Sequence, residues 1–368
     1  MYKGICGLGF GMMRLPNRDG SIDIEATCAL VDSFLESGYS YFDTAWAYPG
    51  SEEALKKALV ERYPRDRYKL ATKNAAWRSK DRSEMERQFQ TSLDRTGVDF
   101  FDCYLLHNLG ENRTAFFDEY DAWSFVQNLK DDGLVKHIGF SFHDRASALE
   151  KILEKHPELE FVQLQVNYAD WNNPAIQSRE CIEVAKRYDM PVIVMEPLRG
   201  GLLANPPDEV KDVFDKSGLK GSYASWALKF AADCDNVCMV LSGMNSPEQM
   251  DDNISSLRNF QGLSDIEKTI IGDAAETLAS IPVIPCTSCD YCAEVCPMDI
   301  GISGTFTAYN LLTLYKNMDF SMSQISWLVD LHNRKRADQC IGCGACEKVC
   351  PQHIDIIEQL KVCNSRLQ

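Results

Sequence analysis

The chain has 368 residues, of which 45% are hydrophobic and 25% charged, a composition typical of a globular protein rather than a disordered one. Its formal net charge of −16 argues against binding to nucleic acid or to anionic membrane surfaces. No apolar run approaches the ~20 residues that would span a bilayer, so we expect no membrane span.

The amino-terminal segment and the cysteines together indicate the cellular compartment in which the protein is expected. The opening MYKGICGLGFGMMRLP lacks a basic region followed by an apolar core, so no export signal is expected. Seven of the 15 cysteines are scattered without a pattern, and we interpret them as packing residues in a reducing environment. We therefore expect a cytoplasmic protein.

Short apolar runs and amphipathic runs alternate along the first 280 residues. The apolar runs predict eight strands, at 7–15, 41–43, 69–73, 101–106, 137–141, 161–166, 191–195 and 237–241. The amphipathic runs predict helices, at 23–38, 51–63, 82–97, 122–133, 144–156, 174–189, 222–233 and 246–260. Eight strand–helix units predict a (β/α)8 TIM barrel over residues 1–278. A doubly wound sheet is the rival fold, but no G-x-G-x-x-G run opens a helix.

Polar side chains stand where three of these units pass from strand to loop, which is where barrel enzymes carry their chemistry. Asp43, Lys73 and His107 each end a predicted strand, and Tyr48 follows Asp43 by five residues. A buried lysine needs a partner, and Asp43 is the natural one. We expect Lys73 to lower the pKa of Tyr48 and so to make it a proton donor to a carbonyl oxygen, with His107 orienting that oxygen. A purely structural role for the four residues is the alternative.

Residues 5–258 resemble the aldo-keto reductase superfamily, through LGFGMMRLP, YFDTAWAYPGSEEALKKAL, LATKN, DCYLLHN, HIGFSFHD, VQLQVNY, MEPLRGGLL and LSGMNSPEQMDDNI, in that order. The resemblance implies that Asp43, Tyr48, Lys73 and His107 form the catalytic tetrad. It also implies that Ser141 and Gln165 hold a nicotinamide carboxamide, although Phe142 replaces the Asn that often follows that Ser. NADP(H) is therefore the expected coenzyme.

The last strand–helix loop carries the rest of the implied coenzyme site. Many members of the family use a Lys-Ser start and an Arg there to bind the 2′-phosphate. This chain has no arginine at the expected place, and the helix that begins near residue 246 could offer N–H groups to a phosphate instead. The residues that the resemblance assigns to this loop are Ser242, Gly243, Met244, Asn245, Gln249 and Asn253.

Two copies of C-x2-C-x2-C-x3-C-P, at 286–297 and 340–351, lie beyond a predicted linker at 279–285. This run is typical of bacterial ferredoxins, in which the fourth cysteine of one run binds the cluster of the other. We predict two [4Fe–4S] clusters, with zinc as the disfavoured alternative. The ligand sets are Cys286, Cys289, Cys292 and Cys350 for one cluster, and Cys340, Cys343, Cys346 and Cys296 for the other.

The segment between the two runs reads as helices, with Phe306, Tyr309, Leu312 and Tyr315 on one stripe. Residues 279–368 thus resemble the α-helical ferredoxin domains that are attached to other oxidoreductases. The stripe is interpreted as packing around the clusters, with a partner-binding face as the alternative.

The two parts differ in how they carry electrons, because a nicotinamide transfers two electrons as hydride whereas a cluster takes one at a time. We therefore expect an oxidoreductase whose barrel acts on a small organic substrate while the clusters exchange electrons with it or with a ferredoxin- or flavodoxin-type partner. A flavin could connect the two. The alternatives are an NADPH-dependent carbonyl reductase with structural or redox-sensing clusters, and a non-catalytic electron-transfer or regulatory subunit.

Overall fold

The computed structural model describes residues 7–111, 113–174, 176–286, 288, 290–350 and 352–367. By contacts the chain divides into two compact units. The first comprises the described residues up to Ala204 with Gly218–Gly272, and the second comprises Asn205–Ser217 with the described residues from Asp273 on. Among the described residues no helix is long and apolar enough to cross a membrane.

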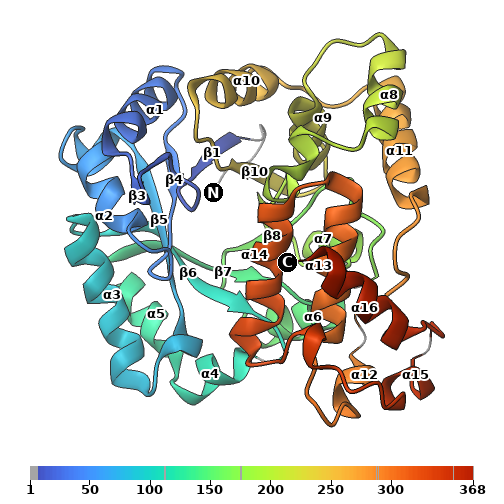
Figure 1. Ribbon diagram of the computed structural model, residues 1–368. Coiled ribbons are helices and arrows are strands. Elements are labelled where there is room, and N and C mark those ends of the chain that lie inside the picture. The colour runs from blue at the N-terminus through green and yellow to red at the C-terminus, as the bar shows by residue number, and fades with distance from the viewer. Residues whose placement is uncertain are drawn as a thin grey trace. The chain divides into compact units, whose positions relative to one another are not determined.

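The first unit is a closed parallel barrel in the order β1-β10-β9-β8-β7-β6-β5-β4, which confirms the predicted fold (Figure 1). All eight predicted strands are present. Their bounds are β1 (Gly7–Gly11), β4 (Tyr41–Asp43), β5 (Lys69–Asn74), β6 (Phe101–Leu109), β7 (Val135–Phe142), β8 (Phe161–Gln165), β9 (Val192–Met195) and β10 (Val237–Ser242). A small hairpin of β2 (Asn17–Arg18) and β3 (Ser21–Ile22), which the sequence did not predict, follows β1.

Helices lie around these strands (Figure 1). They are α1 (Ile24–Glu36), α2 (Ser51–Leu55), α3 (Arg82–Thr96), α4 (Thr114–Glu119), α5 (Ala122–Asp131), α6 (Ala146–Lys155), α7 (Ser178–Arg187), α9 (Tyr223–Ala232) and α10 (Pro247–Leu257). Local sequence sets their ends: the Asp23 carboxylate caps α1 by accepting from Ala26 N, and Gly97 ends α3 with a positive φ of 74°. The predicted helix at 51–63 is instead α2 followed by a π-helical turn, Lys56–Val60.

The barrel interior is filled by side chains rather than open. Side chains alternate along each strand, so every second residue points inward. One inward layer is an apolar cluster of Tyr41, Ala71, Cys103, Leu105, Phe161, Ile193, Cys238, Met239 and Leu241. Packing is tight enough that a Cβ on Gly139 would lie 2.6 Å from the Phe161 carbonyl oxygen, so only glycine fits there.

The second unit is mainly helical. It contains α8 (Asp208–Ser217), the end of α11 (Asp265–Ser280), α12 (Tyr291–Glu294), α13 (Ile302–Tyr315), α14 (Met318–Leu328), α15 (Ala345–Lys348) and α16 (Ile356–Arg366). Its core is built from Ile284, Cys292, Ile300, Ile302, Phe306, Cys346, Ile354, Ile356, Leu360 and Cys363. The predicted stripe on α13 is only partly buried, since Phe306 and Tyr315 are buried whereas Leu312 is not.

Candidate active site and cysteine pockets

A polar layer lies above the apolar layer, toward the carboxyl ends of the strands. The alternation that turns Tyr41 inward also turns Asp43 inward, and the same holds for Ala71 with Lys73 and for Leu105 with His107. All three polar side chains are buried. The sequence prediction that strand ends bring these residues together therefore agrees with their positions.

Lys73 and Asp43 form the centre of this layer. The Lys73 ammonium donates to Asp43 Oδ1 and to the Thr44 carbonyl oxygen, the latter at 2.7 Å. The other carboxylate oxygen, Asp43 Oδ2, accepts from the Gln163 side-chain amide at 3.1 Å. Burial, the largest cause, would lower the pKa of Lys73, but Asp43 and Tyr48 together outweigh it, so this pKa lies above its ordinary value. Lys73 is therefore a fixed positive charge.

Tyr48 lies beside this charge and beside His107. The Lys73 Nζ is 5.1 Å from the centre of the Tyr48 ring, and the Tyr48 and His107 ring centres are 5.7 Å apart in an edge-on contact. We expected Lys73 to bring the pKa of Tyr48 below its ordinary value. The net shift is upward, because burial and the Asp43 carboxylate together exceed the effect of Lys73.

His107 is held at its backbone rather than at its ring. The Trp77 indole Nε1 donates to the His107 carbonyl oxygen at 3.2 Å, and the two ring centres lie 6.4 Å apart. Burial first, and then the charge of Lys73, keep the pKa of His107 well below 6.5, so the imidazole is neutral at physiological pH. Among the described residues its Nδ1 atom has no hydrogen-bond partner.

Ser141 and Gln165, the residues expected to hold a carboxamide, both lie at the same end of the barrel and both have partners. Ser141 Oγ accepts from Asn108 N at 2.8 Å, which leaves its hydroxyl hydrogen available. The Gln165 amide donates to Asp170 Oδ2 at 3.0 Å, and the opposite oxygen of Asp170 pairs with Arg199 at 3.0 Å.

The loop after β10 contains the other expected coenzyme residues. Ser242 Oγ accepts from the Asn253 amide at 2.8 Å, and Met244 is buried. Gly243, Asn245 and Gln249 are exposed. Two backbone N–H groups at the start of α10 are already bound by side chains, Asn245 N by Gln249 Oε1 (2.9 Å) and Gln249 N by Ser246 Oγ (3.3 Å). Fewer N–H groups are thus available to a phosphate than the sequence suggested.

Sequence reasoning missed two parts of this site. Gln163 precedes Gln165 by two residues on β8, and strict alternation would have placed it inside the barrel. The other part is a set of charged side chains beyond β8 and β9, where Arg14 bonds Glu196 at 3.3 Å and Asp170 is fully buried. No local motif indicates that set, because its members are far apart in the chain.

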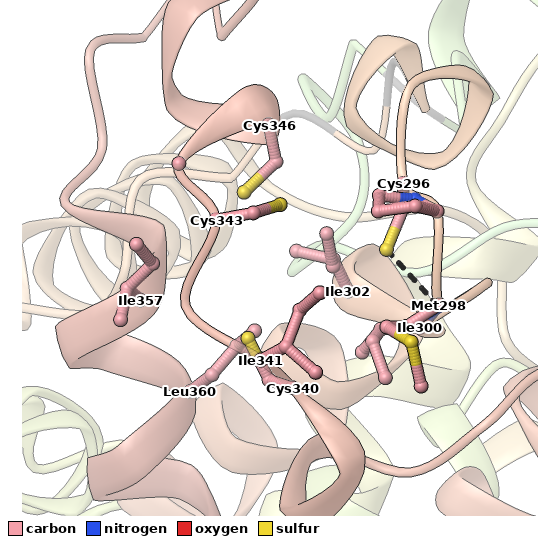
Figure 2. A pocket seen from close by; sticks show the side chains of 12 residues that line it. Cys296, Met298, Ile300, Ile302, Cys340, Ile341, Cys343, Cys346, Ile357 and Leu360 are labelled. Atoms are coloured by element: carbon pink, nitrogen blue, oxygen red, sulfur yellow. Dashed lines mark hydrogen bonds between the residues drawn. The ribbon is translucent and has the colours of Figure 1, made fainter.

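Four of the predicted cluster ligands line one pocket in the second unit. Cys340, Cys343 and Cys346 come from one loop, and Cys296 comes from the other cysteine run. Figure 2 shows their sulfur atoms arranged around the pocket, together with the hydrogen bond that Ile300 N donates to the Cys296 sulfur at 3.4 Å. The walls are apolar and include Met298, Ile300, Ile302, Ile341 and Leu360.

A second pocket repeats the first with an offset of 54 residues. Cys286, Cys292 and Cys350 line it, as the counterparts of Cys340, Cys346 and Cys296, while Cys289 lies outside the described residues. The backbone follows the same repeat, because Ser288 and Asp290 adopt the positive φ angles (53° and 60°) that Gly342 and Gly344 adopt in the other loop (68° and 73°). The two loops therefore curl alike around their pockets.

The donors present suit an iron–sulfur cluster. Thiols from a tight loop, joined by one thiol from the other run, surround a space with apolar walls, and a backbone N–H points at one sulfur. Among the described residues, no three His, Cys, Asp or Glu side chains converge as they would around a single metal ion. A cubane needs its thiolates spread around four irons rather than gathered on one ion.

Comparisons with known proteins assign both parts of the chain. Residues 7–274 match the model of the Aldo/keto reductase family, and residues 285–354 match a 4Fe-4S dicluster domain. The second match supports iron–sulfur clusters over zinc.

Individual relatives and structures agree with the first match. An aldo-keto reductase of Mycolicibacterium vanbaalenii is 29% identical over 258 residues, which cover 68% of this chain and 81% of that protein. A methylglyoxal reductase of Salmonella typhimurium is 31% identical over 180 residues, or 45% of this chain and 58% of its own length.

Two solved structures share the fold. A holo aldo-keto reductase of Bacillus halodurans has a TM-score of 0.60 at 24% identity and covers 73% of this chain and 92% of its own. An aldo-keto reductase of Klebsiella pneumoniae in complex with NADPH has a TM-score of 0.58 at 19% identity and covers 73% and 90%. The chain belongs to the aldo/keto reductase family, and it is an oxidoreductase whose barrel is followed by a 4Fe-4S dicluster domain.

Proposed function

We propose that the barrel transfers hydride between NADP(H) and a carbonyl or alcohol substrate, and that the second unit exchanges single electrons through two [4Fe–4S] clusters. The observation that carries the first half is the gathering of Tyr48, Lys73, Asp43 and His107 at one end of the barrel, with Lys73 buried and paired. A relative named as a methylglyoxal reductase acts on a carbonyl compound, which supports this chemistry.

Each residue of the tetrad has one task in this proposal. The coenzyme supplies or accepts the hydride. The Tyr48 hydroxyl donates its proton to the carbonyl oxygen, and the nearby Lys73 ammonium stabilises the phenolate that forms. Asp43 holds the ammonium in place, and the neutral His107 imidazole donates a hydrogen bond that orients the carbonyl oxygen.

NADP(H) is the coenzyme that we propose, because the Klebsiella pneumoniae structure that shares this fold is described as a complex with NADPH. Ser141 and Gln165 would bind the carboxamide, and the loop Ser242–Asn245 with Gln249 and Asn253 would bind the adenylate end. The absence of an arginine at the expected place in this loop means that a 2′-phosphate would be held by neutral donors.

The clusters would be held by Cys286, Cys289, Cys292 and Cys350 in one pocket and by Cys340, Cys343, Cys346 and Cys296 in the other. They supply one-electron chemistry when bound, and a ferredoxin- or flavodoxin-type protein is a suitable partner for it. The flavin connection stays a hypothesis based on electron counting, and none of the comparisons supports it.

A second candidate function has its own support. The residues that line the cysteine pockets, such as Ile300, Ile302, Ile354 and Ile356, are also the hydrophobic core of the second unit. Clusters bound there would hold that unit together whether or not they pass electrons. The chain would then be an NADPH-dependent carbonyl reductase with structural or redox-sensing clusters. A non-catalytic subunit is disfavoured because the sequence contains all four residues of the implied tetrad.

One preparation tests these alternatives. The protein is purified without air, its iron, sulfide and organic cofactors are measured, and aldehyde reduction is assayed with NADPH and, separately, with a dithionite-reduced viologen. Tyr48→Phe should lower NADPH-driven reduction by about 10²- to 10⁴-fold. The control is Tyr63→Phe, whose hydroxyl bonds Asp32 at a partly exposed site.

The clusters are tested with Cys343→Ser, because Cys343 is an exposed ligand. Electron exchange predicts viologen-driven turnover that this variant loses. Turnover with NADPH alone, together with no response to any one-electron donor, would establish the reductase with structural clusters. Unchanged NADPH-driven turnover in Tyr48→Phe would refute the catalytic assignment.

A further inference from the structure

Two arginines contact one tryptophan at the mouth of the barrel. The Arg78 guanidinium carbon lies 4.9 Å from the centre of the Trp77 ring, and that of Arg113 lies 5.0 Å from it. Arg78 follows Trp77 in the loop after β5, whereas Arg113 belongs to the loop after β6. Two separate loops thus bring two positive charges to the same aromatic ring.

No carboxylate of the described residues neutralises either charge. Within the described ranges, no ion pair or side-chain hydrogen bond involves Arg78 or Arg113, although the chain has 54 acidic residues and only 38 basic ones. Asp144, in the neighbouring loop after β7, accepts instead from the backbone N–H groups of Glu111 and Arg145, both at 2.7 Å. Arg113 is partly buried, and burial is the cause that lowers its pKa, with no anion to oppose it. An unpaired, partly buried guanidinium is costly to keep.

The pair lies next to the proposed catalytic residues. The Trp77 ring centre is 6.4 Å from that of His107, and the Trp77 indole N–H is bonded to the His107 backbone. Both arginines contribute to the lowered pKa of His107, which is consistent with their charges acting at that ring. His107 is itself buried with an unpartnered Nδ1 among the described residues.

The order of strands separates this pair from the proposed coenzyme loop. In the closed barrel β6 lies four strands away from β10 in either direction, so the loop that carries Arg113 is opposite the loop of Ser242–Asn245. The loop after β5, which carries Arg78, is next to the loop that carries Arg113. The two arginines are therefore placed to meet the substrate rather than the phosphates of a coenzyme bound over β10.

We propose that Arg78, Arg113 and Trp77 form a subsite for the carboxylate of an anionic carbonyl substrate. This inference deepens the proposed function and rests on it. Two planar guanidiniums can each give two parallel hydrogen bonds to a carboxylate, and the indole covers the carbon part of the substrate. The reacting carbonyl then lies toward His107 and Tyr48. A negatively charged substrate would balance the charges of Arg78 and Arg113, which no carboxylate of the described residues pairs with.

The test compares 4-carboxybenzaldehyde with its neutral methyl ester, methyl 4-formylbenzoate, as substrates of the holoenzyme with NADPH. The two aldehydes differ in charge, and because the ester group withdraws electrons more strongly than a carboxylate, intrinsic reactivity favours the ester and works against the expected preference for the acid. The measured quantity is the ratio of the two kcat/KM values. In the wild type it should favour the acid by about tenfold or more, and in Arg113→Gln and Arg78→Gln it should fall about tenfold or more, mainly through the KM of the acid.

Two further variants define the cause. Arg113→Lys keeps the charge and should restore part of the ratio, because Lys binds a carboxylate as a point charge without the bidentate geometry. Arg87→Gln, at an exposed site on α3, removes one positive charge elsewhere and should leave the ratio as in the wild type. An equal loss in Arg87→Gln would show a general effect of net charge and would overturn the subsite.

The outcomes separate this inference from the proposed function. If the ratio is the same in the wild type as in Arg113→Gln and Arg78→Gln, the subsite is wrong while the carbonyl reductase stands. If the wild type reduces neither aldehyde, the proposed function fails. In that case the subsite is tested by calorimetry, which compares the binding of monomethyl terephthalate with that of dimethyl terephthalate. Preferential binding of the acid supports the subsite, and equal binding overturns it.

Discussion

The Gln163 amide nitrogen donates to Asp43 Oδ2 at 3.1 Å, and the two residues come from β8 and β4, which lie opposite each other in the barrel. The hydrogen bond therefore crosses the barrel interior and joins residues 120 positions apart. Together with Lys73 it leaves neither oxygen of the buried Asp43 carboxylate unsatisfied. The lysine beside the proposed proton donor is thus held by a carboxylate that is bonded at both oxygens.

Replacing Asp43 should destabilise the barrel because it leaves the buried Lys73 ammonium without its carboxylate. We expect Asp43→Asn to lower the free energy of unfolding by about 3–5 kcal/mol, measured by urea unfolding of the barrel. Asp32→Asn is the matched control, since Asp32 pairs with Arg62 at a partly exposed site and should cost about 1 kcal/mol or less. Equal costs for the two variants would contradict a buried, unscreened pair.

The pH dependence of carbonyl reduction should be flat through neutrality. Tyr48 acts as an acid, and because its pKa lies above the ordinary 10.0, it keeps its proton up to high pH. The pKa of His107 lies well below 6.5, so the imidazole does not change charge between pH 6 and 9. We expect kcat/KM to fall only above about pH 10. An inflection near pH 6.5 that disappears in His107→Gln would show that this expectation is wrong.

Asp102 should stabilise the fold in a pH-dependent way. Burial would raise its pKa, but the bonds from Arg65, Leu70 N and Lys136 outweigh burial, so the pKa lies below 3.8. The unfolded chain then takes up the proton first, and the stabilisation is present above about pH 4 and lost as the pH falls through the folded pKa.

The measurement is the free energy of unfolding of Asp102→Asn against pH. At pH 7 we expect a loss of about 1–3 kcal/mol, which shrinks toward zero as the pH falls below about 4. Asp235→Asn, an exposed partner of Lys186, should lose about 1 kcal/mol or less at every pH. A loss in Asp102→Asn that did not depend on pH would rule out the charge as its cause.

The two proposed clusters should differ in reduction potential. The pockets match position for position, but Asp290, Ser303, Phe306 and Gln352 in one stand where Gly344, Ile357, Leu360 and Met298 stand in the other. A carboxylate beside a cluster disfavours the added electron, so Asp290→Asn should raise one potential by on the order of tens of millivolts. Asn also tolerates the positive φ at this position.

Redox titration followed by EPR would measure this, with Asp319→Asn on α14 as the control. The expected result is that one of the two potentials moves in Asp290→Asn and neither moves in the control. If both clusters titrate together in the wild type and in the variant, the charge of Asp290 does not reach either cluster.

The barrel could be predicted from sequence because its signal is repeated eight times, as alternating strands followed by amphipathic helices. Most of the elements that the sequence did not predict are short or marginal, although the 16-residue helix α11 is also among them. α4 has six residues, and α8 buries only Val210 and Phe214 among charged neighbours, so neither gives a clear period. The π-helical turn after α2 has the same residue types as an α-helix, and only its backbone distinguishes it.

Some features of the candidate site can likewise be recognised from the sequence, and others cannot. Asp43, Lys73 and His107 are visible in sequence because each ends an apolar strand. The net pKa of Tyr48 is not visible, because it is a balance between burial and two opposite charges that only coordinates can weigh. The carboxylate partner of Gln165 was likewise hidden, since Asp170 reaches it through the turn after β8.

The exchange of one cysteine between the two pockets makes each half of the repeat depend on the other. Cys296 sits with Cys340, Cys343 and Cys346, while Cys350 sits with Cys286 and Cys292. A chain that ended before the second run would lose Cys350 from the pocket of Cys286 and Cys292, and three of the four cysteines from the other pocket. A shorter tail with one complete cluster site therefore cannot arise by simple truncation, and the two cysteine runs must be kept or lost together.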